Sequence, residues 1–483
     1  MENETQNWTI CLICNGRGKK RERVRKKVRI AYQKAIDHFE KSKTEGTPPF
    51  RPQGHLTICS SCSGSGLSKA SNTTKIDKVN FPHVAIIGGG IGGTALAVAC
   101  LHRGIPFTLF ERDGSFDERS QGYGLTLQQA SKAIAGFGIV SLKGGLISTR
   151  HVVHTTDGKI IGEWGIRKWV EPAERTPPKH TNIHIARQAL RLALLKQLGG
   201  DNKVEWNHQL DNFKELPDNK GVELNFTVNG ISKTTKADLV VGADGIRSAV
   251  RNQLIGNDTS PLRYLDCIVI LGICPLSALK DVESDLLDSA TVFQTANGNE
   301  RIYMMPFNKD SVMWQLSFPM TEEAAKTLST QGKEALKTEA IKRTQWHHPI
   351  PQIVAATHAE QVSGYPVYDR TLLSSELLEQ SQQITLIGDA AHPMSPFKGQ
   401  GANQALLDAL SLARGINRAC RPKSGWREDG IRKRVLTEFE TEMLTRSASK
   451  VEDSAAAAQF LHSDVVLLES NEPRGRCLKQ KDE

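Results

Sequence analysis

A glycine-rich loop offers the most specific chemistry in the sequence. Residues 88–93 read Gly-Gly-Gly-Ile-Gly-Gly, contain the pattern GxGxxG, and follow a short apolar run. Gly88 permits a tight turn, Gly90 lets the backbone approach a pyrophosphate, and Gly93 allows close packing of the next helix on the strand. Glu111 lies 18 residues after Gly93, where a carboxylate can accept hydrogen bonds from a ribose diol. This arrangement predicts a βαβ unit that binds a dinucleotide.

Two further turns follow apolar strands later in the chain. The first contains Asp244 and Gly245, and the second contains Gly388 and Asp389. The segment 396–403 then reads PFKGQGAN and opens a helix. The N-terminus of a helix carries partial positive charge, so it can face the negatively charged edge of a flavin. An acidic residue at the ribose position favours FAD or NAD over a phosphorylated ribose, and these later turns favour FAD.

In this order, the GxGxxG loop with Glu111, the Asp-Gly turn and the Gly-Asp turn resemble the group A flavoprotein monooxygenases. These aromatic-ring hydroxylases share the fold of para-hydroxybenzoate hydroxylase, and the PFxGQGxN segment is also similar to that of tetracycline-inactivating monooxygenases. The resemblance covers about residues 83–440. It implies FAD as cofactor, NADPH or NADH as co-substrate, and a flavin C4a-hydroperoxide. With O2, that species would hydroxylate an aromatic or other electron-rich small molecule.

The resemblance also implies a set of cofactor contacts. The glycine loop would hold the FAD pyrophosphate, Glu111 the adenosine ribose, Asp389 the ribityl chain or pyrophosphate, and the last loop the isoalloxazine ring. Arg112 and Arg187 would contact the flavin, although each can instead be a surface charge. No catalytic side chain is expected, because the flavin carries the chemistry, and His392 is expected to pack. The implied cofactor-binding residues are Gly88, Gly90, Ile91, Gly92, Gly93, Glu111, Arg112, Arg187, Asp244, Gly245, Asp389, Pro396, Gly399, Gly401, Ala402 and Asn403.

Other activities of the same fold stay open at this point. An FAD oxidoreductase that inserts no oxygen, and a flavin-bound sensor or interaction protein, would both carry these motifs. Flavin halogenases resemble this fold but have a Trp-x-Trp-x-Ile-Pro signature, whereas residues 314–319 read WQLSFP and lack the second Trp. The sequence does not disclose the substrate.

Four cysteines near the N-terminus form a second candidate site. Cys11 with Cys14, and Cys59 with Cys62, belong to two copies of CxxCxGxG. Two CxxC knuckles supply four soft ligands for tetrahedral zinc. The motif resembles the zinc-binding repeat of DnaJ-type chaperones, which carry four repeats and two zinc ions. The two repeats here are enough for one Zn²⁺, and free or redox-active dithiols are the alternative.

The charge of the chain is concentrated beside these cysteines. The formal net charge is +9, and residues 1–78 hold 16 Lys and Arg against seven Asp and Glu, so the remainder is neutral. The basic run 19–29 can contact nucleic acid, acidic protein or lipid headgroups, but a solvated helix face is the favoured interpretation. Nucleic acid is not expected because no aromatic residues interleave with the charges. A protein partner of the module is possible.

The cysteine count and the hydropathy indicate where the protein works. Nine cysteines without a signal peptide indicate a reducing compartment such as the cytoplasm. No apolar stretch is long enough to predict a transmembrane helix, although peripheral membrane association stays open. The expected small molecules are a substrate and O2.

These motifs require an α/β scaffold that brings three strand ends together. We expect a Rossmann-like FAD-binding domain interleaved with a β-rich substrate domain, a small N-terminal zinc module and a helical C-terminus. The basic segment 19–43 is expected to be helical. The expected divisions are 1–78 for the module and linker, 79–440 for the core and 441–483 for a C-terminal helix and tail. Within the core, FAD-binding segments are expected at about 82–150, 182–260 and 381–420, and substrate-domain segments at about 151–181 and 261–380. Five large apolar residues of the last segment are candidates for the wall of the substrate site, although sheet core is the favoured interpretation of each: Met304, Met305, Phe307, Trp314 and Phe318.

Overall fold

A parallel five-stranded sheet forms the centre of the molecule. The computed structural model describes residues 6–42, 47–118, 122–165 and 182–474. The strand order is β12–β6–β5–β16–β22, and each neighbouring pair is parallel. The three middle positions are short apolar runs, as expected for strands covered on both faces. The strands are β5 (Val84–Ile87), β6 (Phe107–Phe110), β12 (Val204–Glu205), β16 (Leu239–Gly242) and β22 (Ile384–Leu386).

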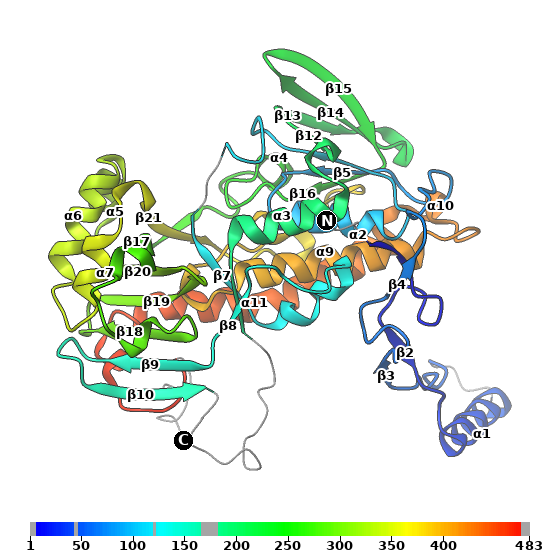
Figure 1. Cartoon of the computed structure of the whole chain (residues 1–483). Helices are drawn as coiled ribbons and strands as arrows, with labels where there is room; N and C mark the ends of the chain where they lie inside the picture. The colour runs from blue at the N-terminus through cyan, green and yellow to red at the C-terminus, as the bar shows by residue number, and fades with distance from the viewer. Residues whose placement is uncertain (1–5, 43–46, 119–121, 166–181, 475–483) are drawn as a thin grey trace.

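Helices from distant parts of the chain pack around this sheet. The helix after the glycine loop, α2 (Ile91–Leu101), contacts α3 (Arg187–Leu198) and α9 (Gly401–Ala419). In Figure 1, α9 runs beside the long α11 (Thr437–Phe460) beneath α2 and α3. The C-terminal helix therefore starts a few residues before the expected boundary and packs on the core. The shorter helices are α4 (Ala249–Ile255), α8 (Ser375–Leu378) and α10 (Trp426–Asp429).

A seven-stranded sheet forms the second layer, as the sequence predicts for a β-rich domain. Its order is β10–β9–β18–β19–β20–β17–β21. Three helices, α5 (Glu322–Thr330), α6 (Lys333–Arg343) and α7 (Ile350–Ala356), group at the outer end of this sheet (Figure 1). The strands are β9 (Arg150–His154), β10 (Ile160–Gly165), β17 (Leu262–Pro275), β18 (Thr291–Ala296), β19 (Arg301–Asn308), β20 (Ser311–Pro319) and β21 (Val362–Arg370).

The two faces of this sheet bury different apolar clusters, because successive side chains alternate between faces. Met304, Trp314 and Phe318 are buried on the face covered by helices, where the Trp314 indole donates to Thr357 Oγ1 at 2.8 Å. Met305 lies on the other face, in a cluster with Phe307 and Phe397. Phe397 belongs to the PFKGQGAN segment, so this second face of the sheet packs against the expected flavin loop.

Two smaller sheets complete the fold. Strands β7 (Gly124–Leu127), β11 (Ile183–Ala186) and β8 (Leu146–Ile147) pair beside the large sheet, and β13 (His208–Glu215), β14 (Val222–Val228) and β15 (Ile231–Ala237) form an antiparallel meander. Residues 166–181 of the expected substrate segment and 475–483 of the expected tail lie outside the described residues. Among the described helices, none combines the length and apolar character needed to cross a bilayer.

The N-terminal module is built from two short antiparallel pairs. Strand β1 (Asn7–Ile10) pairs with β4 (Leu67–Ala70), and β2 (Lys19–Arg21) pairs with β3 (Leu56–Ile58). The helix expected over 19–43 is restricted to α1 (Lys26–Ser42), because its first residues are hydrogen-bonded as a strand beside the cysteine knuckles. In Figure 1 the module sits at one end of α9, and α1 projects away from the body.

Candidate functional site

The glycine loop lies at the carboxyl end of β5, where ligands bind in open α/β sheets. Gly88 has φ of +107°, and a Cβ there would lie 2.6 Å from the Ala243 carbonyl oxygen. A Cβ on Gly93 would lie 1.9 Å from the Gly88 oxygen, so helix α2 approaches the strand as closely as its backbone allows. Ile91 and Gly92 begin this helix, whose first N–H groups have no intrahelical acceptor and are available to a phosphate.

Glu111 closes this loop from the end of β6. Its Oε2 accepts from the Gly89 N–H at 2.7 Å, and its Oε1 accepts from the Asp113 N–H at 3.1 Å. The Gly89 carbonyl in turn accepts from Arg191 Nε at 2.7 Å and Thr94 Oγ1 at 3.1 Å. The carboxylate predicted to bind a ribose therefore touches the loop predicted to bind the pyrophosphate. Sequence reasoning missed Arg191, whose only signal is a cation within an apolar helix.

The two predicted flavin-contacting arginines lie in different surroundings. The Arg187 guanidinium stacks 5.6 Å above the Tyr123 ring, and its Nη2 would be 4.0 Å from a Cβ on Gly90. Arg187 thus lies beside the glycine loop. Arg112 is exposed and makes no side-chain hydrogen bond or ion pair to the described residues. The structure brings Arg187 to the site and leaves Arg112 at its edge.

The Asp244–Gly245 turn lies next to Gly88, but the Asp244 carboxylate is already engaged. Its oxygens accept from Ser248 Oγ and from the backbone N–H groups of Ala249 at 2.8 Å and Val250 at 3.2 Å. It therefore caps the first turn of α4. Burial raises the pKa of Asp244 despite these hydrogen bonds. Gly245 has φ of +83° and open space where a side chain would lie.

The Gly388–Asp389 turn is held from behind by Asp408 of α9. Asp408 Oδ2 accepts from the Gly388 N–H at 2.9 Å and lies 2.7 Å from His392 Nε2, while its Oδ1 accepts from Arg446 at 2.8 Å. Burial alone would raise the pKa of Asp408, but His392 and Arg446 outweigh it and lower that pKa. His392 thus has a structural partner, in line with its expected packing role. Sequence reasoning missed Asp408, an acidic residue on the buried face of an apolar helix.

Asp389 itself points away from this network. Its side chain is exposed, and Oδ1 lies 3.5 Å from the position of a Cβ on Gly401. The surrounding protein desolvates the carboxylate and raises its pKa, although His392 and Arg187 act in the opposite direction. Asp389 is therefore available to a ligand in front of the N-terminus of α9.

The loop before α9 is shaped by Asn403. Its buried side chain donates to the carbonyls of Thr126 and Gly399, both at 2.9 Å, and accepts from the N–H groups of Gln128 at 2.8 Å and Ala130 at 3.1 Å. The Asn403 side chain therefore points into the loop and fixes its conformation. Gly399 has φ of +60°, and Pro396, Gly401 and Ala402 remain partly accessible along the loop. The N–H groups of Gly401 and Ala402 can face a flavin ring.

Asp408→Asn is expected to weaken FAD binding about tenfold, equivalent to about 1.4 kcal/mol. The amide keeps one acceptor but loses the charge that balances Arg446 and His392, so the Gly388 turn is held less firmly. Titration of the apoprotein with FAD, followed by flavin fluorescence, measures this effect. Glu442→Gln is the matched control, because Glu442 also pairs with Arg446, at 2.7 Å, but does not contact Gly388. Equal losses in both variants would contradict the role given to Asp408.

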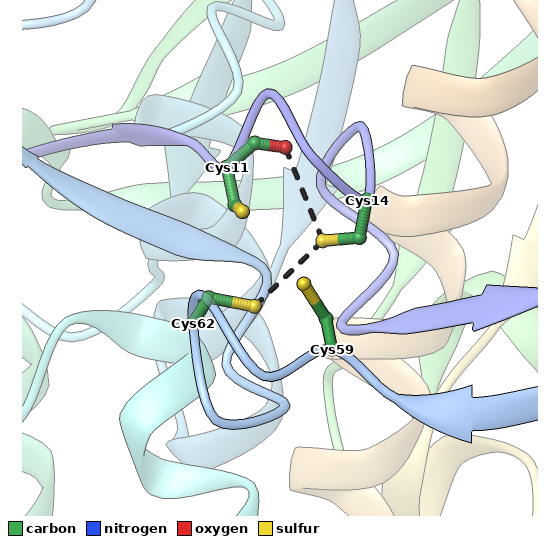
Figure 2. Close-up of side chains that lie close together, drawn as sticks. All are labelled: Cys11, Cys14, Cys59 and Cys62. Atoms are coloured by element: carbon green, nitrogen blue, oxygen red, sulfur yellow. Dashed lines mark hydrogen bonds between the residues drawn. The ribbon is translucent and has the colours of Figure 1, made fainter.

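The four N-terminal cysteines converge on one point (Figure 2). Their sulfur atoms all lie within 4.8 Å of one another, and Cys14 and Cys62 Sγ are 3.7 Å apart. The N–H of Gly18 donates to Cys14 Sγ at 3.2 Å, and the N–H of Gly66 donates to Cys62 Sγ at 3.3 Å. Each knuckle therefore turns a backbone donor toward its second sulfur, as the CxxCxGxG spacing predicts. This donor set fits a tetrahedral zinc ion.

The cysteine module is docked on the second half of α9. Arg414 Nη2 donates to the carbonyls of Gly64 at 3.1 Å and Ser65 at 2.9 Å. Asn417 donates to the Asn15 carbonyl at 3.1 Å, so one helix contacts both knuckles. The module therefore shares a helix with the flavin loop.

A buried arginine, Arg103, lies close to this interface. Arg103 is 3% exposed, and among the described residues its Nε and Nη2 have no hydrogen-bond acceptor. Burial and, to a smaller extent, the Arg414 charge lower the pKa of Arg103 to about 9, whereas Cys100 and Cys14 act in the opposite direction. Negative charge on the sulfurs would thus offset two cations of the core.

Comparison with known proteins agrees with this geometry. Residues 82–429 match the family model described as FAD binding domain, which begins directly after the cysteine module. The aurachin C monooxygenase/isomerase of Stigmatella aurantiaca is 29% identical over 333 residues, covering 68% of this chain and 79% of that protein. The 3-amino-4-hydroxybenzoate 2-monooxygenase PtmB3 of Streptomyces platensis is 27% identical and covers 69% and 79%.

A solved structure shows the same fold. The crystal structure of Klebsiella pneumoniae HpxO with FAD and uric acid has a TM-score of 0.63 and 19% identity, covering 84% of this chain and 95% of that chain. The family match spans well over half of the chain and contains all three strand-end turns. The chain therefore belongs to the FAD binding domain family and is an FAD-dependent monooxygenase.

Proposed function

We propose that this enzyme uses NAD(P)H and O2 to hydroxylate an aromatic or other electron-rich small molecule. One oxygen atom would enter the substrate as a hydroxyl group. The other would leave as water, with NAD(P)H supplying two electrons and one hydrogen and a proton supplying the second hydrogen. The names of two similar proteins support the reaction class. PtmB3 is named as a 2-monooxygenase of 3-amino-4-hydroxybenzoate, and the structure of HpxO was solved in complex with FAD and uric acid.

The convergence of three strand-end turns with the N-terminus of α9 carries this proposal. The glycine loop and Glu111 would hold the pyrophosphate and ribose, and Asp389 would hold the chain between the two ends of FAD. When bound, FAD would supply both the acceptance of electrons and the activation of O2. The protein would bind and orient the two reactants, and Asn403 would keep the loop beside the ring in place.

The substrate would lie between this loop and the flavin-facing side of the large sheet. Thr126 Oγ1 of β7 lies 4.0 Å from Met305 Sδ, and the Gly124 nitrogen lies 2.9 Å from Met313 Sδ. Strand β7 therefore contacts this side of the large sheet directly. Tyr303 shares the face, and burial raises its pKa to about 12, so its hydroxyl would stay protonated as a donor. An apolar wall with a few polar groups suits a planar aromatic ligand and limits the access of water.

An anaerobic titration with NADPH or NADH tests the proposal. The purified protein is expected to show the absorbance of bound FAD, to bleach on reduction and to regain its bands in air. A panel of phenols and aminobenzoates is then screened for faster NAD(P)H oxidation, with ¹⁸O₂ incorporation as the deciding readout. Turnover without ¹⁸O in any product would instead favour an oxidoreductase that inserts no oxygen. A protein that holds FAD but is never reduced would favour a sensor.

We further infer that the cysteine module holds one structural Zn²⁺. The four buried thiols, the two backbone donors and the absence of a fifth ligand among the described residues support a closed four-cysteine site. Such a site stabilises structure and leaves no open position for substrate.

A further inference from the structure

The segment between the two cysteine knuckles is largely exposed in the described structure. We call residues 19–58, which comprise β2, α1 and β3, the basic arm. None of its described residues is buried, although the neighbouring knuckles are. Figure 1 shows α1 standing clear of both large sheets. Because Arg414 and Asn417 hold the knuckles against α9, the arm is anchored at its base with its helix directed away from the core.

The arm carries almost all of the net charge of the protein. It contains 12 Lys and Arg residues and four Asp and Glu, a net charge of +8 out of +9 for the whole chain. Within the described residues, no ion pair to the core neutralises these side chains. Like charges held this closely repel one another, so an anionic surface would be attracted to the arm over roughly a Debye length, about 10 Å at 0.1 M salt.

Helix α1 is also amphipathic. Five of its residues, at positions i, i+4, i+7, i+8 and i+11, form one apolar stripe: Val28, Tyr32, Ala35, Ile36 and Phe39. The opposite face carries four lysines, Lys26, Lys27, Lys34 and Lys41, together with Ile30 and Asp37. An apolar stripe on a helix of a folded domain normally covers a core. Here nothing in the described structure covers it, and Val28 is 44% exposed.

The apolar surface of the arm extends beyond this helix. Phe50 is 84% exposed, and on β3 Leu56 is 55% and Ile58 69% exposed. A protein groove that accepts one helix would cover the stripe of α1 but would leave these three residues in water. A lipid interface is broad enough to receive the stripe and these three residues together. Basic amphipathic helices with aromatic residues on the apolar face bind at the boundary between lipid headgroups and acyl chains.

We propose that the basic arm docks this enzyme on an anionic lipid surface, with the stripe of α1 in the headgroup region and the lysines and arginines against lipid phosphates and carboxylates. This inference rests on the arm and is independent of the reaction proposed above. It differs from the solvated helix face favoured by the sequence, because the structure shows an apolar stripe and the exposed Phe50 beside the charge.

Co-sedimentation of the full FAD-loaded chain with vesicles tests this proposal. We expect binding to phosphatidylcholine vesicles that contain 30% phosphatidylserine, at about 0.1 M salt, and at least tenfold weaker binding to pure phosphatidylcholine or at about 0.5 M salt. The triple variant Lys26→Glu, Lys27→Glu, Arg29→Glu is expected to lose at least tenfold in binding. The variant Ile36→Ser, Phe39→Ser is expected to do the same without any change in charge.

The control carries the same charge change elsewhere. Lys143, Lys280 and Lys342 are exposed core residues without an ion pair in the described structure, and their triple replacement by Glu is expected to retain binding. FAD content and melting temperature check that each variant is folded, which we expect because no described residue of the arm is buried. Absence of vesicle binding by the folded wild type would overturn the proposal. So would equal losses in the arm and control variants. Binding to an acidic polypeptide such as polyglutamate, without vesicle binding, would assign the arm to a protein partner instead.

Discussion

Removal of zinc from the cysteine module is expected to lower both the melting temperature of the whole protein and its affinity for FAD. The metal would carry four thiolates and a net charge of about −2. Arg414 binds the second knuckle directly, and the buried Arg103 has no acceptor among the described residues for two of its nitrogens. The cluster and these arginines are thus expected to balance one another in a dry interface.

The physical cost of metal loss follows from this burial. Breaking a buried charge pair by removing one partner typically costs about 3–5 kcal/mol, because the other charge is left uncompensated. Without the metal most of this negative charge is lost and the two guanidinium groups are no longer offset, so the module would separate from α9. Since Arg414 and Gly401 belong to one helix and are about 20 Å apart along it, loosening one end exposes the other to fraying. A decrease of several degrees in melting temperature and about a tenfold loss of FAD affinity are expected.

Metal analysis and calorimetry measure this outcome. One zinc per chain is expected in the native protein, and none in Cys14→Ser, Cys59→Ser or after treatment with a strong chelator. Cys267→Ser is the control, because Cys267 is a buried thiol of the large sheet far from the module. Chelation of a full equivalent of zinc without any change in melting temperature would show that the module is attached to α9 without supporting it.

The fold was predictable where local pattern and tertiary contact agree. The buried runs of the parallel sheet and the turns that follow them are encoded within about thirty residues, so GxGxxG and Glu111 identify both the element and its ligand. The seven-stranded sheet was predicted only as β character, because the pairings that assemble it, β9 with β18 and β17 with β21, join strands about a hundred residues or more apart and leave no local signal. The strand β2 was missed for a similar reason, since its partner β3 lies beyond α1.

The site was predictable for backbone functions and less so for side chains. Asn403 is in the predicted loop, but the structure shows its amide bound to Thr126 and Gln128. Asp244 likewise caps α4 in the structure. Asp408 and Arg191 hydrogen-bond to the backbone of the turns from α9 and α3, whose sequences resemble ordinary apolar helices. A motif gives the position of a polar residue, whereas its partners depend on which helix lies behind it.

Gly93→Ala is expected to abolish the retention of FAD during purification and to weaken its binding at least a hundredfold, about 2.7 kcal/mol. A Cβ at this position would lie 1.9 Å from the Gly88 oxygen and 3.3 Å from the Ala243 side chain. The first contact is with backbone, so no change of rotamer relieves it. Helix α2 would have to move away from β5, which displaces the N–H groups that would face the pyrophosphate.

Gly415→Ala supplies the matched control, because it makes the same change in a helix of the same domain. Its Cβ would meet the Val435 side chain at 3.4 Å, an ordinary contact, and alanine favours the helix more than glycine by about 1 kcal/mol. This variant is expected to keep its FAD. The absorbance ratio of flavin to protein, and fluorescence titration of the apoproteins, compare the two. Full FAD retention in Gly93→Ala would place the pyrophosphate away from this loop, because a helix start displaced from β5 could no longer present its N–H groups to it.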